Sequence, residues 1–362
     1  MRVLIAPDSF GETLTAVQAA EAMAAGWSAA RPGDVVVLAP QSDGGPGFAD
    51  VISATTGGMR SSRVAGPLGT ATAARWVLAD GTAYIESAQA VGLGLLGGPP
   101  SRATSLDAHS RGVGELIAAA VDAGARRIVV GLGGSSCTDG GRGMVEALGG
   151  FVRARERLRG VTLVAATDVE HPLLGEHGAA HVFGPQKGAD ESAIALLEQR
   201  NTAWSGELER LCGSGVADRP GAGAAGGLGA ALLALGAVRE SGAEVVAACT
   251  GQADQLAEAD LVLTGEGRFD HQSLRGKLVT SLAAAARRLG VPTVVVAGQV
   301  AVDRDAAADA GIVAAFSVAE FAGSVERAMT EAADRLEALT SCVADGWRGA
   351  AGAARCAPIH EE

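Results

Sequence analysis

The fold class is decided by residues 127–141, RIVVGLGGSSCTDGG, in which an apolar run leads directly into a loop rich in glycine and hydroxyl side chains. The run Arg127–Gly131 is short, continuous and β-branched, which is typical of a buried strand in a parallel sheet. The segment after Gly141 is rich in Ala, Met and Val and predicts a helix. The stretch therefore predicts one strand–loop–helix unit of an α/β protein.

The same alternation extends along the chain in both directions. Further buried strands are predicted at Val3–Ala6, Val35–Ala39, Thr162–Ala166, Asp260–Thr264, Thr293–Ala297 and Ile312–Phe316. Helices are predicted at Ala16–Ala29, Val113–Ala123, Leu278–Leu289 and Ser324–Ala338, the first capped by Thr13 or Thr15. Strands and helices in this order predict a largely parallel sheet with helices on both faces.

Residues 60–90 interrupt this rhythm. Arg63–Ala65, Ala74–Leu78 and Ala83–Ser87 are short segments joined by turns, and the Asp80-Gly81 pair suits a hairpin turn with positive φ. An inserted domain explains the interruption. We therefore expect a discontinuous α/β domain of residues 1–62 plus 255–362, and an inserted α/β domain of residues 63–254.

Composition excludes several classes of function. Lys plus Arg number 29 against 41 Asp plus Glu, a net charge of −12, and aromatic residues make up 3%. Such a chain lacks the basic stripe and the stacking rings of a nucleic-acid binder. No apolar run approaches the roughly 18 residues of a membrane span, and the N-terminal run is too short for a signal peptide. Five cysteines without a CxxC pair predict reduced thiols, so we expect a cytoplasmic protein with no membrane partner.

Two segments are unusually rich in glycine. The loop 131–141 holds five Gly, three hydroxyl side chains and an Asp, which favours a cradle for phosphate or carboxylate over an ordinary βα turn. The segment 220–229, PGAGAAGGLG, matches G-x-G-x-x-G, but no strand precedes it. It is read either as a binding loop or as a helix start with small residues for close packing, and it gives little support to a nicotinamide cofactor.

Charged residues gather in a third segment, 264–277, which directly follows a predicted strand. Its acids are Glu266 and Asp270, and its bases include Arg268 and Lys277. Ligands of open α/β sheets bind beyond the carboxyl ends of the strands, and phosphoryl transfer needs acids for Mg²⁺ and bases for phosphate. The alternative is a solvated charged loop.

Single acids follow other predicted strands: Asp8, Asp43 and Asp168. Each alone is more often a turn residue or a helix cap. They converge only if their strands share one sheet or face one cleft.

Lysine is rare in this chain: only Lys187 and Lys277 occur beside 27 Arg, and Asn201 is the single asparagine. A GC-rich genome explains the scarcity. Where Lys is replaced by Arg so widely, each retained Lys is a candidate for a tight site that a guanidinium does not fit.

Taken together, these segments resemble the bacterial-type, ATP-dependent glycerate kinases over about residues 1–340. The resemblance rests on eight blocks in order: residues 6–10, 43–45, 66–69, 131–141, 168–175, 183–189, 220–229 and 264–277. It implies phosphorylation of glycerate by ATP with Mg²⁺. It also implies a flavodoxin-like three-layer parallel-sheet domain with an inserted second α/β domain containing a mixed sheet, and a site in the cleft between them.

The resemblance and the residues together give a hypothesis for each role. Catalytic residues are expected at Asp168, Asp270, Lys277, Arg268 and Lys187, with Asp168 or Asp270 accepting the hydroxyl proton. Substrate and phosphate are expected to bind at Gly133, Gly134, Ser135, Ser136, Asp8 and Ser9. Mg²⁺ is expected at Asp43, Asp139 and Glu266. Glycerate is the expected partner, nucleic acid is not, and the sequence leaves a homodimer open.

The chain departs from the family pattern at several positions. The pattern usually has Lys where Gly11 stands, Glu where Pro46 stands and Asn where Thr138 stands. Codon drift would replace Lys by Arg and not by Gly. Two alternatives therefore remain open: a kinase for a related small hydroxy acid, and a catalytically weakened relative that binds a metabolite.

Overall fold

The computed structural model describes residues 1–274 and 278–349 and divides into two compact units. Unit 1 comprises Met1–Ser42 and the chain from Ala247 onward, and unit 2 comprises Asp43–Val246. The predicted boundaries lie at 62/63 and 254/255, whereas the units divide at 42/43 and 246/247. As a result, α2 (Phe48–Thr56) belongs to unit 2. The reason is local: the Glu86 carboxylate accepts hydrogen bonds from the backbone N–H groups of Gly47 and Ala49, where α2 begins.

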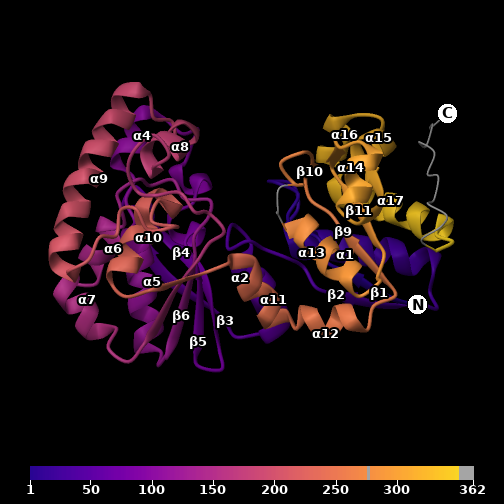
Figure 1. The fold of residues 1–362 in the computed structure, drawn as a ribbon, viewed down its shortest axis with the longest axis horizontal. Helices are drawn as coiled ribbons and strands as arrows, with labels where there is room; N and C mark the ends of the chain where they lie inside the picture. Colours follow the sequence, from indigo (N-terminus) through magenta and orange to yellow (C-terminus); the bar gives the residue numbers. More distant parts are fainter. Residues whose placement is uncertain (275–277, 350–362) are drawn as a thin grey trace. The chain divides into compact units, whose positions relative to one another are not determined.

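Unit 1 is built on a five-stranded parallel sheet in the order β2-β1-β9-β11-β13 (Figure 1). The strands are β1 (Arg2–Ile5), β2 (Val35–Leu38), β9 (Leu261–Thr264), β11 (Thr293–Ala297) and β13 (Ile312–Ser317). Counted along the chain within the unit, this order is 2-1-3-4-5, the flavodoxin-like arrangement. A short parallel pair, β10 (Arg268–Phe269) with β12 (Gln299–Val300), accompanies the sheet. The predicted fold class is confirmed.

Helices cover both faces of this sheet because neighbouring strand residues point to opposite sides. Val3 and Ile5 pack with residues of α1 and α17, whereas Leu4 and Val262 pack with residues of α12 and α13. The helices are α1 (Ala16–Ala30), α12 (Gln252–Ala257), α13 (Leu278–Arg288), α14 (Arg304–Asp309), α15 (Val318–Ala322), α16 (Val325–Thr330) and α17 (Ala332–Gly346). Thr15 caps α1 in a reciprocal pair with Gln18, one of the two caps that the sequence predicts.

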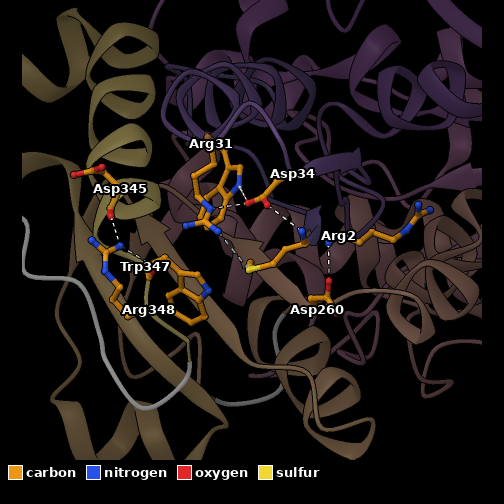
Figure 2. A network of polar contacts seen from close by, with 9 residues as sticks. Arg2, Arg31, Asp34, Asp260, Asp345, Trp347 and Arg348 are labelled. Carbon is orange, nitrogen blue, oxygen red and sulfur yellow. Dashed lines mark hydrogen bonds and ion pairs between the residues drawn. The ribbon is translucent and has the colours of Figure 1, made fainter.

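A network of polar contacts fixes the end of α1 (Figure 2). The Asp34 carboxylate accepts hydrogen bonds from Arg31 Nε at 2.6 Å, the N-terminal ammonium at 2.9 Å and Trp27 Nε1 at 3.1 Å. Burial opposes ionisation, but these three donors outweigh it and lower the pKa of Asp34 to about 2.

We expect Asp34→Asn to lower the free energy of unfolding by about 1–2 kcal/mol at pH 7, because the amide cannot accept three charge-assisted bonds. The pKa of Asp34 is below its unfolded value of 3.8, so its contribution is present above pH 4 and is lost as pH falls towards 2. Urea unfolding of both proteins at pH 7 and pH 3 measures this. A matched control, Asp122→Asn, breaks only an exposed pair with Arg157 and should change stability by less than about 0.5 kcal/mol. Equal losses in the two variants would contradict the prediction.

Unit 2 is built on a six-stranded mixed sheet in the order β3-β4-β5-β6-β7-β8. The strands are β3 (Met59–Ala65), β4 (Ala71–Ala79), β5 (Thr82–Glu86), β6 (Arg127–Gly131), β7 (Thr162–Ala166) and β8 (Val238–Glu240). The first three are antiparallel neighbours and the last four are parallel. The predicted hairpin turn is confirmed: Asp80 and Gly81 have φ of 48° and 77°. The inserted domain therefore contains the expected mixed sheet.

Helices of unit 2 also lie on both faces of its sheet. Ile85 and Ile128 pack with residues of α5 and α6, whereas Tyr84, which points the other way, meets Phe48 of α2 edge to face. Besides α2, the helices are α3 (Ala88–Val91), η1 (Leu93–Leu96), α4 (Arg102–Asp107), α5 (Arg111–Asp122), α6 (Arg142–Ala147), α7 (Phe151–Arg157), α8 (Ala179–Phe183), η2 (Pro185–Lys187), α9 (Glu191–Cys212) and α10 (Ala224–Ala234). α11 (Gly242–Thr250) begins in unit 2 and ends in unit 1.

Some expectations are wrong in detail. The single helix predicted over Ser324–Ala338 is two helices, α16 and α17, because Glu331 between them has non-helical φ and ψ of −117° and 35°. The expectation of five reduced thiols fails at Cys342, which is disulfide-bonded, and Cys356 lies outside the described residues. In the part of the chain that the structure describes, no helix combines the length and apolar character that crossing a bilayer requires.

Candidate functional site

The Gly-rich loop 131–141 begins at the carboxyl end of β6 and leads into α6. Its glycines permit a close backbone approach. A Cβ on Gly133 would lie 2.5 Å from Gly45 Cα, and one on Gly134 would lie 2.6 Å from Pro46 Cγ. Gly134 also has φ of 65°, which disfavours other residues. The backbone conformation and close packing of this loop therefore require glycine at more positions than an ordinary turn does.

Lys187 holds this loop from within. Its side chain is 2% exposed, and Nζ donates hydrogen bonds to the Cys137 carbonyl at 2.6 Å and to Ser135 Oγ at 3.0 Å. Burial lowers the pKa of Lys187, and nearby Asp139 acts in the opposite direction. The retained lysine thus contacts the Gly-rich loop directly, from η2 some fifty residues along the chain. An ammonium on a narrow stem fits this enclosed position better than a planar guanidinium.

Two of the three hydroxyl groups of the loop, those of Ser135 and Ser136, have partners within the protein. Ser136 donates to the Val91 carbonyl through both its N–H (2.7 Å) and its Oγ (2.8 Å). Ser135 Oγ accepts from Lys187. Both serines are buried, whereas Gly134 is exposed. Of the four residues of this loop that are predicted to bind substrate or phosphate, the glycines are therefore the more accessible.

Asp139 organises the far end of the loop. Its Oδ2 accepts from the N–H and Oγ of Ser110, both at 2.8 Å, and from the N–H of Gly143 at 3.0 Å. Its Oδ1 accepts from the N–H of Gly141 at 3.2 Å. These bonds fix the start of α6 and the loop together.

Two predicted acids lie beside the loop and are exposed: Asp43 and Asp168. Asp43 opens a turn in which a Cβ on Gly44 would lie 2.9 Å from the Ala166 carbonyl, at the end of β7. Asp168 follows β7, and its Oδ2 accepts from the N–H of Ala243 at 3.3 Å. The sequence placed these acids at separate strand ends. In unit 2 they lie at one edge of one sheet, together with the Gly-rich loop.

Glu86 is a residue of this edge that the sequence analysis missed. It ends β5, is 2% exposed, and binds the first turn of α2. Burial raises the pKa of this carboxyl group, although the bonds from Ala49 and Gly47 act against that rise. The sequence signal that could have identified Glu86 is an acidic residue at the end of an otherwise largely apolar strand.

The second Gly-rich segment, 220–229, packs against the first. Gly226 accepts a hydrogen bond from the N–H of Gly140 at 3.0 Å, and a Cβ on Gly226 would clash with the Cys137 carbonyl. The element directly before the segment is the helix α9 and not a strand. Of the two interpretations that the sequence left open, close packing of small residues explains its composition.

A second group of predicted residues lies in unit 1, where β1 and β9 end side by side. The N–H of Asp8 donates to the Gly265 carbonyl at 2.8 Å, and the N–H of Gly267 donates to the Ser9 carbonyl at 3.3 Å. These bonds bring Asp8 and Ser9 next to the segment that carries Glu266. In unit 1, too, predicted residues from two strand ends therefore lie in neighbouring segments.

The charged loop after Glu266 is ordered by Asp270. Its Oδ1 accepts from the N–H of Gln272 at 2.8 Å, and its Oδ2 lies 3.4 Å from Arg268 Nε. Lys277, the other expected phosphate ligand, lies outside the described residues.

The donor set suits a hard cation. Among residues 1–274 and 278–349, no three His, Cys, Asp or Glu side chains form a metal-binding group. Mg²⁺ usually takes one or two carboxylates and completes its shell with water and substrate phosphates, so the small groups of acids described above fit it.

Comparison with known proteins gives the family. A family model described as "Glycerate kinase family" matches residues 3–154 and 150–348. The chain belongs to the glycerate kinase family. The resemblance drawn from eight sequence blocks is confirmed.

Named relatives agree with this assignment. The chain is 40% identical to a glycerate kinase of Bacillus subtilis and 38% identical to a glycerate 2-kinase of Escherichia coli, each over 93% of this chain and 95% of the relative. It is 58% identical to an uncharacterized protein of Mycobacterium bovis, over 95% of this chain and 91% of that protein. The fold matches a crystal structure of a protein designated glycerate kinase 2 from Salmonella typhimurium LT2, with a TM-score of 0.78, 35% identity and coverage of 95% and 97%.

Proposed function

We propose that this protein is a glycerate kinase that transfers the γ-phosphate of ATP to a hydroxyl group of glycerate. The observation that carries the proposal is the Gly-rich loop beside the exposed carboxylates of Asp43 and Asp168 at one edge of the unit 2 sheet. Phosphoryl transfer depends mostly on positioning and on charge stabilisation. Backbone N–H groups for an anion and carboxylates for a proton or a cation are the parts that it needs.

In unit 2, the exposed turn at Gly133 and Gly134 binds phosphate or the glycerate carboxylate through backbone N–H groups. Asp168 accepts the substrate hydroxyl proton as the phosphoryl group is transferred. Lys187 acts mainly by holding Ser135 and Cys137, and its positive charge favours an anion on the loop. Ser135 and Ser136 keep the loop in shape.

In unit 1, Asp8 and Ser9 bind substrate, Arg268 and Lys277 neutralise phosphate, and Asp270 is the second candidate for the base. A bound Mg²⁺ would supply positive charge to neutralise the phosphate groups of ATP. Asp43 and Glu266 are the first choices to hold it. Asp139 is a weaker choice, because its oxygens already accept four hydrogen bonds. A cytoplasmic location and a homodimer stay predictions from the sequence.

The departures from the family pattern argue for testing the substrate directly. Gly11 has φ of 60°, a conformation that explains glycine at this position but leaves no side-chain charge beside Asp8. Gly11 also lines a pocket of about 260 Å³ with Phe10 and Gln299. A related hydroxy acid is therefore the second candidate substrate.

We expect ATP turnover in the range of about 1–100 s⁻¹ with glycerate, and slower turnover with glycolate, lactate and tartronate. A coupled assay of ADP release across the four acids measures this, and phosphorus NMR of the product identifies the hydroxyl that is phosphorylated. Faster turnover with another acid would transfer the assignment to that acid. Calorimetric binding of glycerate and ATP without turnover would identify a weakened relative instead.

A further inference from the structure

A second, separate pocket lies in unit 2 behind the Gly-rich loop. It has a volume of about 240 Å³ and is lined by the ends of α4 and α6, by the middle of α9 and by the loop residues Thr138 and Asp139. Leu106, Leu197 and Trp204 form apolar walls. Room for roughly eight water molecules at about 30 Å³ each exceeds what a single structural water requires.

Two buried polar groups in this pocket have no partner within the protein. Thr138 and Asn201 are each 1% exposed, and neither Thr138 Oγ1 nor Asn201 Nδ2 forms a hydrogen bond with the described residues. Leaving a buried donor unsatisfied is unfavourable, so such groups are normally paired with protein, water or ligand. Asn201 is the only asparagine of the chain. Its retention in a chain that otherwise lacks asparagine agrees with a specific role for its amide.

The charges and donors of the pocket define what would bind there. Arg142 and Arg200 stand at its exposed side. Arg142 is paired with Glu146, whereas Arg200 donates to the neutral Leu106 carbonyl and forms no ion pair with the described residues. With the hydroxyl of Thr138 and the amide of Asn201, the pocket offers mainly N–H and O–H donors. Acceptor-rich anions match this set.

The pocket lies at a different part of the loop from the turn used in the proposed reaction: its lining includes Thr138 and Asp139 but neither Gly133 nor Gly134. Gly133 and Gly134 face Gly45 and Pro46. A Cβ on Gly140, in contrast, would meet Trp204 and Asn201. Asp139 lines the pocket, but its oxygens accept four hydrogen bonds, which offsets part of its repulsion of an anion.

We propose that this pocket is a binding site for a small organic anion, a carboxylate or a phosphate monoester, held by Thr138, Asn201 and Arg200. The ligand lies against Thr138 and Asp139 of the Gly-rich loop, in a pocket whose lining includes neither the turn at Gly133 and Gly134 nor Asp168. The proposal is independent of the kinase assignment, because it rests on the unpaired donors and the charge of this pocket alone.

The single asparagine makes the test direct. Protein labelled only with [¹⁵N]asparagine has one side-chain NH₂ pair in its NMR spectrum, that of Asn201. We expect this pair to shift saturably with at least one of pyruvate, glycerol 3-phosphate and 3-phosphoglycerate, and not with neutral glycerol. Pyruvate tests the carboxylate and glycerol 3-phosphate tests the phosphate monoester.

Variants separate this site from binding elsewhere. Arg200→Ala should weaken the binding at least about tenfold, and Thr138→Val should weaken it as well, through the loss of donors to the anion. The matched control is Arg210→Ala, an exposed arginine of the same helix outside the pocket, which should leave the affinity unchanged. No saturable shift at 50 mM of any of the three anions would overturn the proposal. An unchanged affinity in Arg200→Ala, or an equal response to glycerol, would overturn it too.

Discussion

Replacement of Lys187 by methionine is expected to lower kcat by about 10²-fold or more while the protein stays folded. Methionine has similar length and fills the buried space, but it donates no hydrogen bond to Cys137 or Ser135. The Gly-rich loop then loses the contact that fixes it at the edge where phosphate is proposed to bind. Loss of about 10²-fold is typical when a preorganised anion site loses its geometry.

Stability should change much less than activity, because two effects oppose each other. The lost hydrogen bonds cost about 1–3 kcal/mol, but burial of an ammonium is itself unfavourable, as its lowered pKa indicates. Lys187→Arg should also lose activity, since the planar guanidinium does not fit the same enclosure. Steady-state kinetics and thermal unfolding of each variant measure the two effects. Arg155→Met, at an exposed position of α7, is the control.

Full activity in both Lys187 variants would contradict a positioning role and leave codon bias as the explanation for this lysine. Retained kcat with a raised KM for ATP would instead place Lys187 in ground-state binding alone. Neither result would change the family assignment, which rests on the whole chain.

The fold was predictable where its cause is local. Apolar runs such as Val3–Ala6 mark buried strands, and Asp80-Gly81 marks a turn by backbone conformation. Thr15 marks a helix start by its side chain. Each of these signals is carried by a few consecutive residues, so sequence alone sufficed for most strands of the two sheets and for the inserted hairpin. The short strand β8 was not predicted.

The site was predictable only in part because its contacts join distant segments. Lys187 bonds to Cys137 fifty residues away, and Glu86 bonds to Gly47 at a separation of 39. No periodicity in the sequence predicts which distant residues form such pairs. Composition nevertheless gave a useful hint: the scarcity of Lys drew attention to Lys187, which is buried against the Gly-rich loop. The spacing of residues could not show that Lys187 is enclosed.

Asp168→Asn is expected to reduce kcat by about 10²-fold or more with little change in KM. Asn keeps the size of the side chain, and its carbonyl oxygen still accepts the bond from Ala243, so the loop after β7 should keep its path. What disappears is the carboxylate that accepts the hydroxyl proton, a contribution that general-base catalysis sets at about 10²–10⁴-fold. Because Asp168 is exposed, unfolding stability should stay within about 0.5 kcal/mol of the original.

The control for this variant lies two residues along the same loop. Glu170 is 73% exposed and pairs with Arg239 at 3.1 Å, so Glu170→Gln removes a negative charge near Asp168 without removing the proposed base. Glu170→Gln should keep most of the turnover. Asp270→Asn tests the alternative base in unit 1. Wild-type turnover in Asp168→Asn, together with a large loss of turnover in Asp270→Asn, would assign the base to Asp270. Equal losses of turnover in Asp168→Asn and Glu170→Gln would attribute the effect to local charge and not to proton transfer.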